Sequence, residues 1–220
     1  MEIGIIGAGH IGGNAARRFA LSGHSVLLSY SRDPSTLDAL AREIGERARA
    51  GTPADAAACP VVVLSVPWRM IDDALAQAGS LTGRIVIDTT NQYGPGGLVT
   101  FPGGATAAQY NAARMPRARY TKTFNTLTAG FQAAVASRTS TDRVVQWVAG
   151  DDAEATATVL QLVRDAGYAP VDIGGTSDCA VMEAPRRRGA VYGEEWRLPD
   201  ALTVVDAVRA GHPIPPTPHY

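Results

Sequence analysis

Three glycines near the N-terminus have the spacing that brings a polypeptide backbone close to a phosphate. They are Gly7, Gly9 and Gly12, with His10 and Ile11 between the last two. Gly7 permits a tight turn, Gly9 lets the backbone approach a pyrophosphate, and Gly12 lets a helix pack closely on a strand. The N-terminus of such a helix adds free N–H groups and a positive dipole end. These positions therefore form a candidate site for dinucleotide phosphates.

The residues around the glycines decide between a dinucleotide site and an ordinary tight turn. The apolar run Ile3–Ile6 precedes them, the helical stretch Ile11–Leu21 follows, and a second apolar run comes at Val26–Leu28. A strand, a helix and a second strand at these distances are the setting in which this motif binds dinucleotides. We therefore prefer the dinucleotide site to the alternative, a strand-to-helix turn without a ligand.

The residues after the second strand distinguish NAD from NADP. An acidic residue there would bond the ribose 2′-hydroxyl and repel a 2′-phosphate. The sequence has Ser31 and Arg32 instead, and both side chains can donate to a phosphate. Asp33, followed by Pro34, is better placed to start the next helix. This pattern favours NADP(H), the alternative being an Arg32 that is merely solvated.

The rest of the chain alternates short β-branched strands with helical stretches. This order predicts an α/β fold of the Rossmann type, with a doubly wound, mostly parallel sheet. Further strands are expected at Val61–Val66, Ile85–Ile87, Tyr120–Phe124, Val144–Val148 and, as an edge strand, Pro170–Ile173. Further helices are expected at Pro34–Ala50, Met70–Ala78, Ala105–Arg114, Asp151–Asp165 and Asp200–Arg209.

Composition excludes several classes of partner and site. The net charge of −1 provides no basic field for nucleic acid or an anionic membrane, and no apolar run is long enough to span a bilayer. The four histidines are scattered, and Cys59 and Cys179 belong to no metal-binding motif. We therefore expect no metal, free thiols and a cytoplasmic location. The chain starts directly with a strand-like run, so no signal peptide is expected.

Six short motifs follow one another in the chain, up to about Asp178. They are Gly7–Gly12, Tyr30–Arg32, Ser65–Trp68, Ile87–Asn91, Lys122–Thr126 and Gly150–Asp152. In their order and spacing the chain resembles NADPH:F420 oxidoreductases and the related reductase domain of the STEAP metalloreductases. The resemblance implies hydride transfer between NADP(H) and a deazaflavin (F420) or flavin, in which the two cofactors carry the chemistry and the protein stacks their rings.

The resemblance also implies further cofactor-binding residues at the ends of the third and fourth strands. Ser65, Val66 and Pro67 would pass the ribose and nicotinamide, and Asn91 would bond the ribose next to the nicotinamide. For Asn91 the alternative is ordinary turn chemistry. For Trp68, packing on the following helix is at least as well supported as a place at the edge of the pocket.

Lys122 and Asn125 are the candidate catalytic residues, because they lie at a strand end in the Lys-x-Phe-Asn-Thr motif of the relatives. They would orient the carboxamide or the acceptor; a surface lysine and a capping asparagine are the alternative. Two other functions stay open. A reductase of a small carbonyl or imine metabolite would need a proton donor, first Lys122 and then Tyr192. A non-enzymatic NADP(H) sensor would bind without turnover.

The C-terminal part departs from the pattern of the family. We divide the chain into an NADP-binding domain, residues 1–178, and a small C-terminal extension, residues 179–220, near the acceptor or a homodimer interface. Pro185 argues against one continuous helix there. Arg186–Arg188 either hold an anionic tail of the small-molecule acceptor or lie on a solvated loop or subunit contact. Tyr192, like Trp196, either stacks on a flat ring or anchors the tail.

Overall fold

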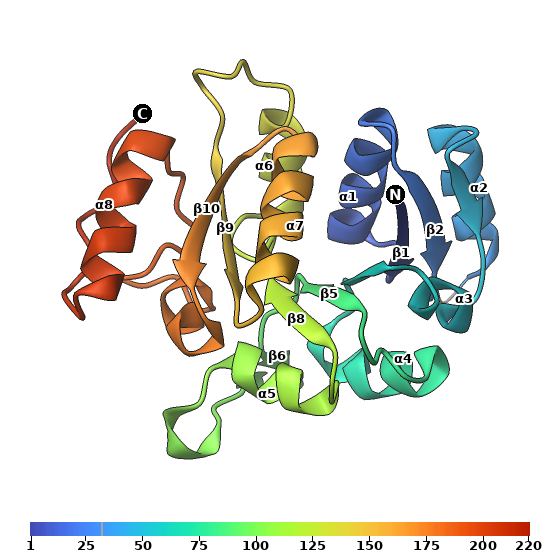
Figure 1. Ribbon diagram of the computed structural model, residues 1–220, viewed down its shortest axis with the longest axis horizontal. Coiled ribbons are helices and arrows are strands. Elements are labelled where there is room, and N and C mark those ends of the chain that lie inside the picture. The colour runs from blue at the N-terminus through green and yellow to red at the C-terminus, as the bar shows by residue number, and fades with distance from the viewer. Residues whose placement is uncertain (32) are drawn as a thin grey trace.

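An eight-stranded sheet runs through the molecule in the order β10-β9-β8-β5-β4-β1-β2-β3 (Figure 1). The structure is a computed structural model that describes residues 1–31 and 33–220. All neighbouring strands are parallel except β8 and β9. The predicted Rossmann-type, mostly parallel sheet is therefore confirmed, and β10 is the edge strand that the sequence predicted.

The elements have the following bounds. The strands of the main sheet are β1 Glu2–Ile6, β2 Ser25–Ser29, β3 Ala48–Ala50, β4 Val61–Leu64, β5 Ile85–Asp88, β8 Arg119–Lys122, β9 Val145–Gly150 and β10 Ala169–Gly174. A small hairpin consists of β6 Tyr93–Gly94 and β7 Gly97–Leu98. The α-helices are α1 His10–Leu21, α2 Ser35–Ile44, α3 Pro53–Ala57, α4 Ile71–Ala78, α5 Ala107–Arg114, α6 Ala129–Val135, α7 Ala153–Asp165 and α8 Leu198–Arg209.

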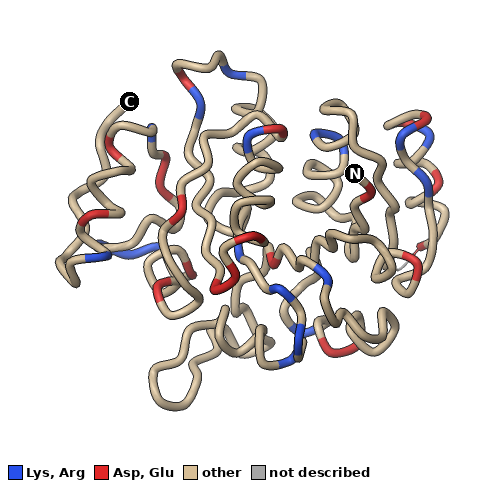
Figure 2. The backbone as a smooth tube through the Cα atoms, viewed as in Figure 1, with Lys and Arg blue, Asp and Glu red and all other residues tan. Residues whose placement is uncertain are grey.

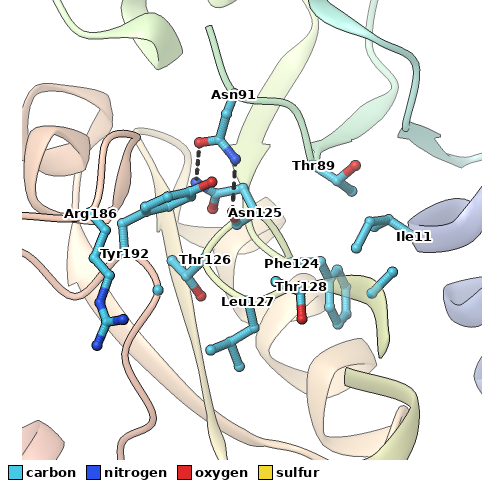
Figure 3. Close-up of a pocket in the computed structure, with 12 residues that line it drawn as sticks. Ile11, Thr89, Asn91, Phe124, Asn125, Thr126, Leu127, Thr128, Arg186 and Tyr192 are labelled. Carbon is cyan, nitrogen blue, oxygen red and sulfur yellow. Dashed lines mark hydrogen bonds between the residues drawn. The ribbon is translucent and has the colours of Figure 1, made fainter. Parts of the chain in front are cut away.

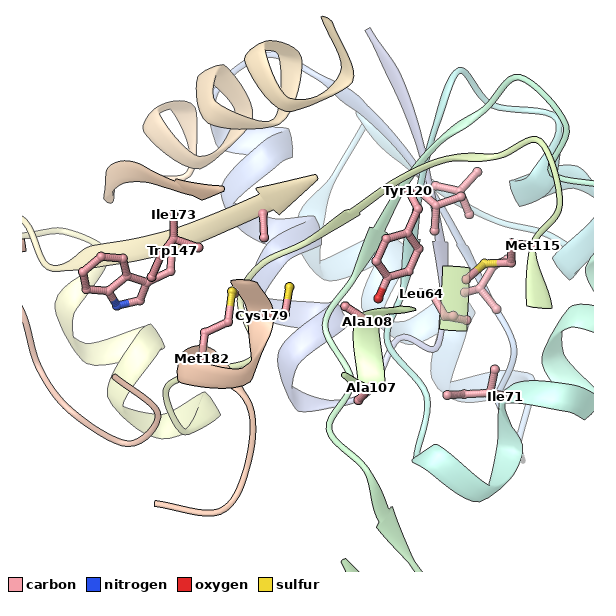
Figure 4. Close-up of a cluster of buried hydrophobic side chains, with 14 of the residues drawn as sticks. Leu64, Ile71, Ala107, Ala108, Met115, Tyr120, Trp147, Ile173, Cys179 and Met182 are labelled. Atoms are coloured by element: carbon pink, nitrogen blue, oxygen red, sulfur yellow. The ribbon is translucent and has the colours of Figure 1, made fainter. Parts of the chain in front are cut away.

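Helices cover both faces of the sheet, which explains why its strands are apolar almost throughout. On β1, Ile3 and Ile5 face one buried cluster, which also contains side chains of α1, α2, α6 and α7. Ile6 faces the other cluster, with side chains of α3, α4, α5 and α8. Part of this second cluster is shown in Figure 4. Charged residues of both signs are interspersed along the fold (Figure 2).

Three sequence-based boundaries were wrong, each for a local reason. The helix expected at Pro34–Ala50 ends at Ile44, because Gly45 takes a positive φ of 97°, and Ala48–Ala50 instead pairs with β2. The strands expected to reach Val66 and Phe124 end two residues earlier, at Leu64 and Lys122. After each of these two strands the backbone turns, at the carboxyl edge of the sheet. The helices α3 and α6 and the β6–β7 hairpin were not predicted.

Residues 179–220 pack on the same sheet as the rest of the chain. The ring of Trp196 meets that of Trp147 on β9 edge-on, with 6.1 Å between centroids, and both rings are buried. The α8 helix lies against β10 at one end of the sheet (Figure 1). A bridge between Val144 and Arg197 adds a backbone connection. No described helix has the length and apolarity that crossing a membrane requires.

Replacement of Trp196 tests how firmly the C-terminal part is attached. Trp196→Ala removes a large side chain that is 1% exposed, and the cavity should lower the free energy of unfolding by about 3–5 kcal/mol in urea titrations. Leu202→Ala on α8 is the control. That side chain is 53% exposed, so the change should stay within about 0.5 kcal/mol. Equal effects of the two substitutions would contradict the described packing.

Candidate active site

The turn between β1 and α1 has the shape that phosphate binding requires. Gly7 has a φ of 102°, and a Cβ there would lie 2.4 Å from the carbonyl oxygen of Ser65. A Cβ at Gly12 would lie 2.1 Å from the carbonyl oxygen of Gly7, so these two glycines are fixed by packing. A Cβ at Gly9 would meet nothing within 4 Å, and no side chain caps the N-terminus of α1. The open space and the uncapped helix end fit a pyrophosphate.

The loop after β2 presents hydroxyl groups at the position where NADP and NAD differ. The Oγ of Ser31 lies 2.8 Å from the Oγ1 of Thr36, and it accepts from the N–H of Asp33. The carboxylate of Asp33 accepts from the N–H of Ser35, the first residue of α2, at 3.0 Å, but the N-cap position itself is occupied by Pro34 and not by Asp33 as predicted. Arg32 lies outside the described residues, so its contact with a 2′-phosphate stays a prediction.

A cavity of about 440 Å³ lies at the carboxyl edge of the sheet (Figure 3). Its lining comes from the first turn of α1, the segments after β5 and β8, and the loop before α8. The lining residues are Ile11, Thr89, Asn91, Phe124, Asn125, Thr126, Leu127, Thr128, Ala129, Arg186, Tyr192 and Gly193. The cavity therefore brings together three of the predicted site residues, Ile11, Asn91 and Asn125.

Asn91 and Asn125 hold each other in place across this edge. The Nδ2 of Asn91 donates to the backbone oxygen of Asn125 at 2.8 Å, and the Nδ2 of Asn125 donates to the Oδ1 of Asn91 at 3.2 Å (Figure 3). A second bond from that Nδ2 reaches the backbone oxygen of Met182 at 2.7 Å. Both hydrogens of the Asn125 side-chain amide thus form hydrogen bonds within the protein, whereas its Oδ1 forms none.

Two buried oxygens in the cavity lining have no protein partner. They are the Oδ1 of Asn125, a residue 4% exposed, and the Oγ1 of Thr126, a residue 2% exposed. A buried polar atom without a hydrogen bond costs about 1–3 kcal/mol, so such atoms point to a missing partner. Both atoms are covered in this structure, so the amide of a bound ligand would reach them only after a small movement of the lining. Asn125 therefore lies at the cavity, and its predicted role in the chemistry stays a prediction.

The loop that carries these two oxygens is held firmly. Phe124 has a φ of 59°, rare for a residue with a side chain, and its ring contacts the rings of Phe19 and Tyr168 edge-on. The Nε2 of Gln132 donates to the backbone oxygens of Phe124 and Leu127 at 2.9 and 2.8 Å. Because the surroundings fix the strained turn, the cavity wall is preorganised.

Lys122 lies in the core beneath the cavity and does not line it. Its side chain is 0% exposed, and its Nζ donates to the backbone oxygen of Thr90 at 2.7 Å and to Asp88 at 3.4 Å. The carboxylate of Asp88 also accepts from Tyr120 at 2.5 Å and from Asn111 at 2.8 Å. Burial opposes ionisation of Asp88, but Lys122 and these donors outweigh it and hold the pKa of the carboxyl below its usual value.

This placement argues against Lys122 as a proton donor to a substrate. A fully buried ammonium in an ion pair has no path to the cavity, and it acts through Thr90, which precedes Asn91. Loss of activity in Lys122→Ala would not identify a proton donor, because the substitution would also leave the carboxylate of Asp88 buried without its cation. We therefore interpret Lys122 as a residue that positions the end of β5.

The other predicted residues after β4 flank the cavity without lining it. Ser65 receives a hydrogen bond at 3.0 Å from Thr89, which does line it. Val66 is buried against the Gly7 turn, and Pro67 is exposed. Trp68 follows the packing alternative, since its buried ring lies against Phe101 and Tyr110. His10 is exposed at the start of α1.

Sequence reasoning missed the hydroxyls and apolar groups that complete the lining. Thr126, Leu127, Thr128 and Ala129 follow Asn125 directly, and the turn into the unpredicted helix α6 brings all four to the cavity. The signal was available in the strand-end position of Asn125, because residues just after a parallel strand share the ligand-binding edge.

Comparison with known proteins identifies the N-terminal part. Residues 2–92 match the family described as NADP oxidoreductase coenzyme F420-dependent. The resemblance to this family is confirmed. The matching family and the solved reductase named below are NADP-dependent, as the predicted class of enzyme is. The match ends at Gln92, so it includes the glycine motif and Asn91 but not Asn125 or the C-terminal part.

Relatives extend the similarity over most of the chain. The chain is 26% identical over 204 residues to the metalloreductase STEAP3 of Rattus norvegicus, and this covers 92% of the chain but 39% of that protein. The chain thus spans about two fifths of the length of the curated relative it matches. A hypothetical protein from Sinorhizobium meliloti is 29% identical, with a TM-score of 0.79 over 90% of this chain and 96% of that one.

A second solved structure is a putative F420-dependent NADP reductase from Arthrobacter sp. FB24. It is 25% identical to the chain, with a TM-score of 0.68 over 81% of this chain and 87% of that one. Both solved structures share the described fold, and they cover more of the chain than the family match does.

Gly9→Ala separates phosphate binding from stability. The new methyl meets no protein atom within 4 Å and φ is −73°, so the free energy of unfolding should change by less than about 0.5 kcal/mol. Because the methyl fills the space proposed for the pyrophosphate, NADPH affinity in a fluorescence titration should fall by about tenfold or more. Gly96→Ala, also free of contacts, is the control. Unchanged affinity in Gly9→Ala would place the phosphates elsewhere.

Removing the charge of Lys122 tests its positioning role. Lys122→Met should lower the free energy of unfolding by about 3–5 kcal/mol, because Asp88 stays buried without a cation. The double variant Asp88→Asn/Lys122→Met should recover most of this loss in urea titrations. A Lys122→Met protein of full stability that binds NADPH normally but has lost turnover would instead give Lys122 a direct part in the chemistry.

Proposed function

We propose that the chain transfers a hydride between NADP(H) and a deazaflavin (F420) or flavin acceptor. The observation that supports this most is the cavity between the first turn of α1 and the loop of residues 185–193. It contains two unpartnered buried oxygens at the level where the nicotinamide would lie. Bound NADPH supplies a hydride, and with one proton from solvent the acceptor ring is reduced by two electrons.

The residues of the chain would bind and orient the two rings. The turn at Gly9 and the first turn of α1 would hold the pyrophosphate, and Ser31 would donate to the 2′-phosphate. Asn125 and Thr126 would bond the carboxamide through their unpartnered oxygens. Ile11 would cover one face of the nicotinamide and exclude water, which leaves the other face to the acceptor.

Hydride transfer between two such rings needs little acid–base catalysis, and the cavity matches this. Lys122 is sequestered in the core. Tyr192 lines the cavity, where burial and a contact of 3.3 Å with the hydroxyl of Tyr93 raise the pKa of its phenol, so it stays protonated at neutral pH. Among the described residues of the lining, Tyr192 is the first candidate for the proton donor of a carbonyl or imine reductase. The proposal includes a homodimer in the cytoplasm, as expected from the resemblance and from the free thiols.

An acceptor screen tests the proposal. Anaerobic absorbance would follow NADPH oxidation with F420, FMN, riboflavin, a cyclic imine and a ketone, and each assay would be repeated with NADH. We expect reduction of a deazaflavin or flavin, and a preference for NADPH over NADH. Tyr192→Phe should leave this reaction within about threefold of the original rate. Turnover of the imine or ketone alone, abolished by Tyr192→Phe, would overturn the proposal, as would tight NADPH binding without any turnover.

A further inference from the structure

One charged side chain lines the cavity among the described residues, and it is Arg186. Figure 3 shows Arg186 and Tyr192 at the end of the cavity that is far from Ile11. No acidic residue of the described chain belongs to the lining, and the nearest carboxylate to Arg186 is that of Glu194, which is bonded to its Nε. The charge therefore stands on the side where the acceptor, not the dinucleotide phosphates, would bind.

The backbone holds Arg186 in this position. A Cβ at Gly193 would lie 3.1 Å from the Cδ and 3.2 Å from the Cγ of Arg186, so the aliphatic part of the arginine packs directly on a bare glycine. Gly193 has a φ of 78°, and its N–H donates to the backbone oxygen of Thr126 at 2.7 Å. This bond joins the arginine loop to the segment with the unpartnered oxygens.

The guanidinium keeps donors available for a ligand. Its Nε donates to the Oε1 of Glu194 at 2.6 Å, and this contact raises the pKa of Arg186. An arginine has five N–H donors in a planar fork, so the Nη groups can bond an anion while Nε keeps its carboxylate. Glu194 thus holds the side chain in place and offsets its charge when no ligand is bound.

The two neighbouring arginines have other positions. Arg187 donates to the backbone oxygens of Glu183 and Pro185 at 2.9 and 3.0 Å, which ties down its own loop. Arg188 is exposed and is not part of the cavity lining. The structure therefore distinguishes Arg186 from Arg187 and Arg188, which the sequence alone did not.

We propose that Arg186 binds an anionic group, a phosphate or carboxylate, on the substituent of the acceptor ring. The enzyme would then select acceptors with a charged substituent over neutral acceptors with the same ring. This inference rests on the proposed function, since it places the acceptor at the end of the cavity away from Ile11. It assigns specificity to a residue that takes no part in the transfer of the hydride.

Equilibrium binding of matched flavins tests the proposal. FMN and riboflavin share one ring and differ by a phosphate, and F420 is compared in the same way with its ring fragment that lacks the phosphate and carboxylates. Each is titrated into the full chain with NADP⁺ present, and quenching of ring fluorescence gives the Kd. We expect the charged member of a pair to bind about tenfold more tightly, as for one exposed charge-assisted hydrogen bond.

Three variants assign that preference. Arg186→Gln should bring the ratio of the two Kd values close to one, whereas Arg188→Gln should keep the original ratio. Glu194→Gln should increase the ratio, because it removes the carboxylate that competes for the guanidinium. A misfolded loop would only weaken binding, so an increase in this ratio would also show that the loop of Glu194→Gln is correctly folded. If FMN and riboflavin both lose affinity equally in Arg186→Gln, the residue supports the loop and the proposal fails.

The outcomes separate this proposal from the proposed function. Binding of a ring with equal Kd for its charged and neutral forms would overturn the role of Arg186 and leave hydride transfer standing. A loss of NADPH affinity in Arg186→Gln as large as the loss for FMN would assign the residue to the cofactor instead. Failure of every flavin and deazaflavin to bind would overturn both.

Discussion

The buried ion pair of Asp88 and Lys122 joins the two strands whose ends carry the candidate site. Asp88 is the last residue of β5 and Lys122 the last of β8, and the register places them opposite each other. The carboxylate also accepts from the N–H of Thr90 at 2.7 Å, while the ammonium donates to the oxygen of the same residue. Asn91 follows, so its position depends on a pair that never meets solvent. A pair of this kind contributes geometry more than stability.

The second constraint is the return of the C-terminal part to the same edge. The carboxylate of Glu183 accepts from the N–H groups of Ala107 and Ala108 at the start of α5, at 2.8 Å each. The oxygen of Met182 receives a bond from Asn125. Through these contacts residues 182–193 are held beside the cavity, and Arg186, Tyr192 and Gly193 form part of its wall. The N-terminal half of the chain thus provides the turn at Gly9, and the C-terminal half provides the cavity wall that contains Arg186 and Tyr192.

The sequence predicted what depends on local pattern and order. Gly9 could be assigned because its neighbours in sequence define a strand, a turn and a helix, and Asn125 because it follows a strand. The burial of Lys122 could not be predicted, since its partner lies 34 residues away and a lysine at a strand end is ordinarily solvated. Arg186 could not be separated from Arg187 for a similar reason, because only the tertiary contact with Gly193 distinguishes them.

The proposed function requires that the carboxyl edge of the sheet holds the dinucleotide with its nicotinamide in the cavity between Ile11 and Asn125. A crystal structure of the full chain with NADP⁺ tests it most directly. We expect the pyrophosphate over Gly9 and the carboxamide bonded to the side-chain oxygen of Asn125 or Thr126, with the free face of the ring toward Arg186. A nicotinamide outside this cavity, with both oxygens still unpartnered, would contradict it.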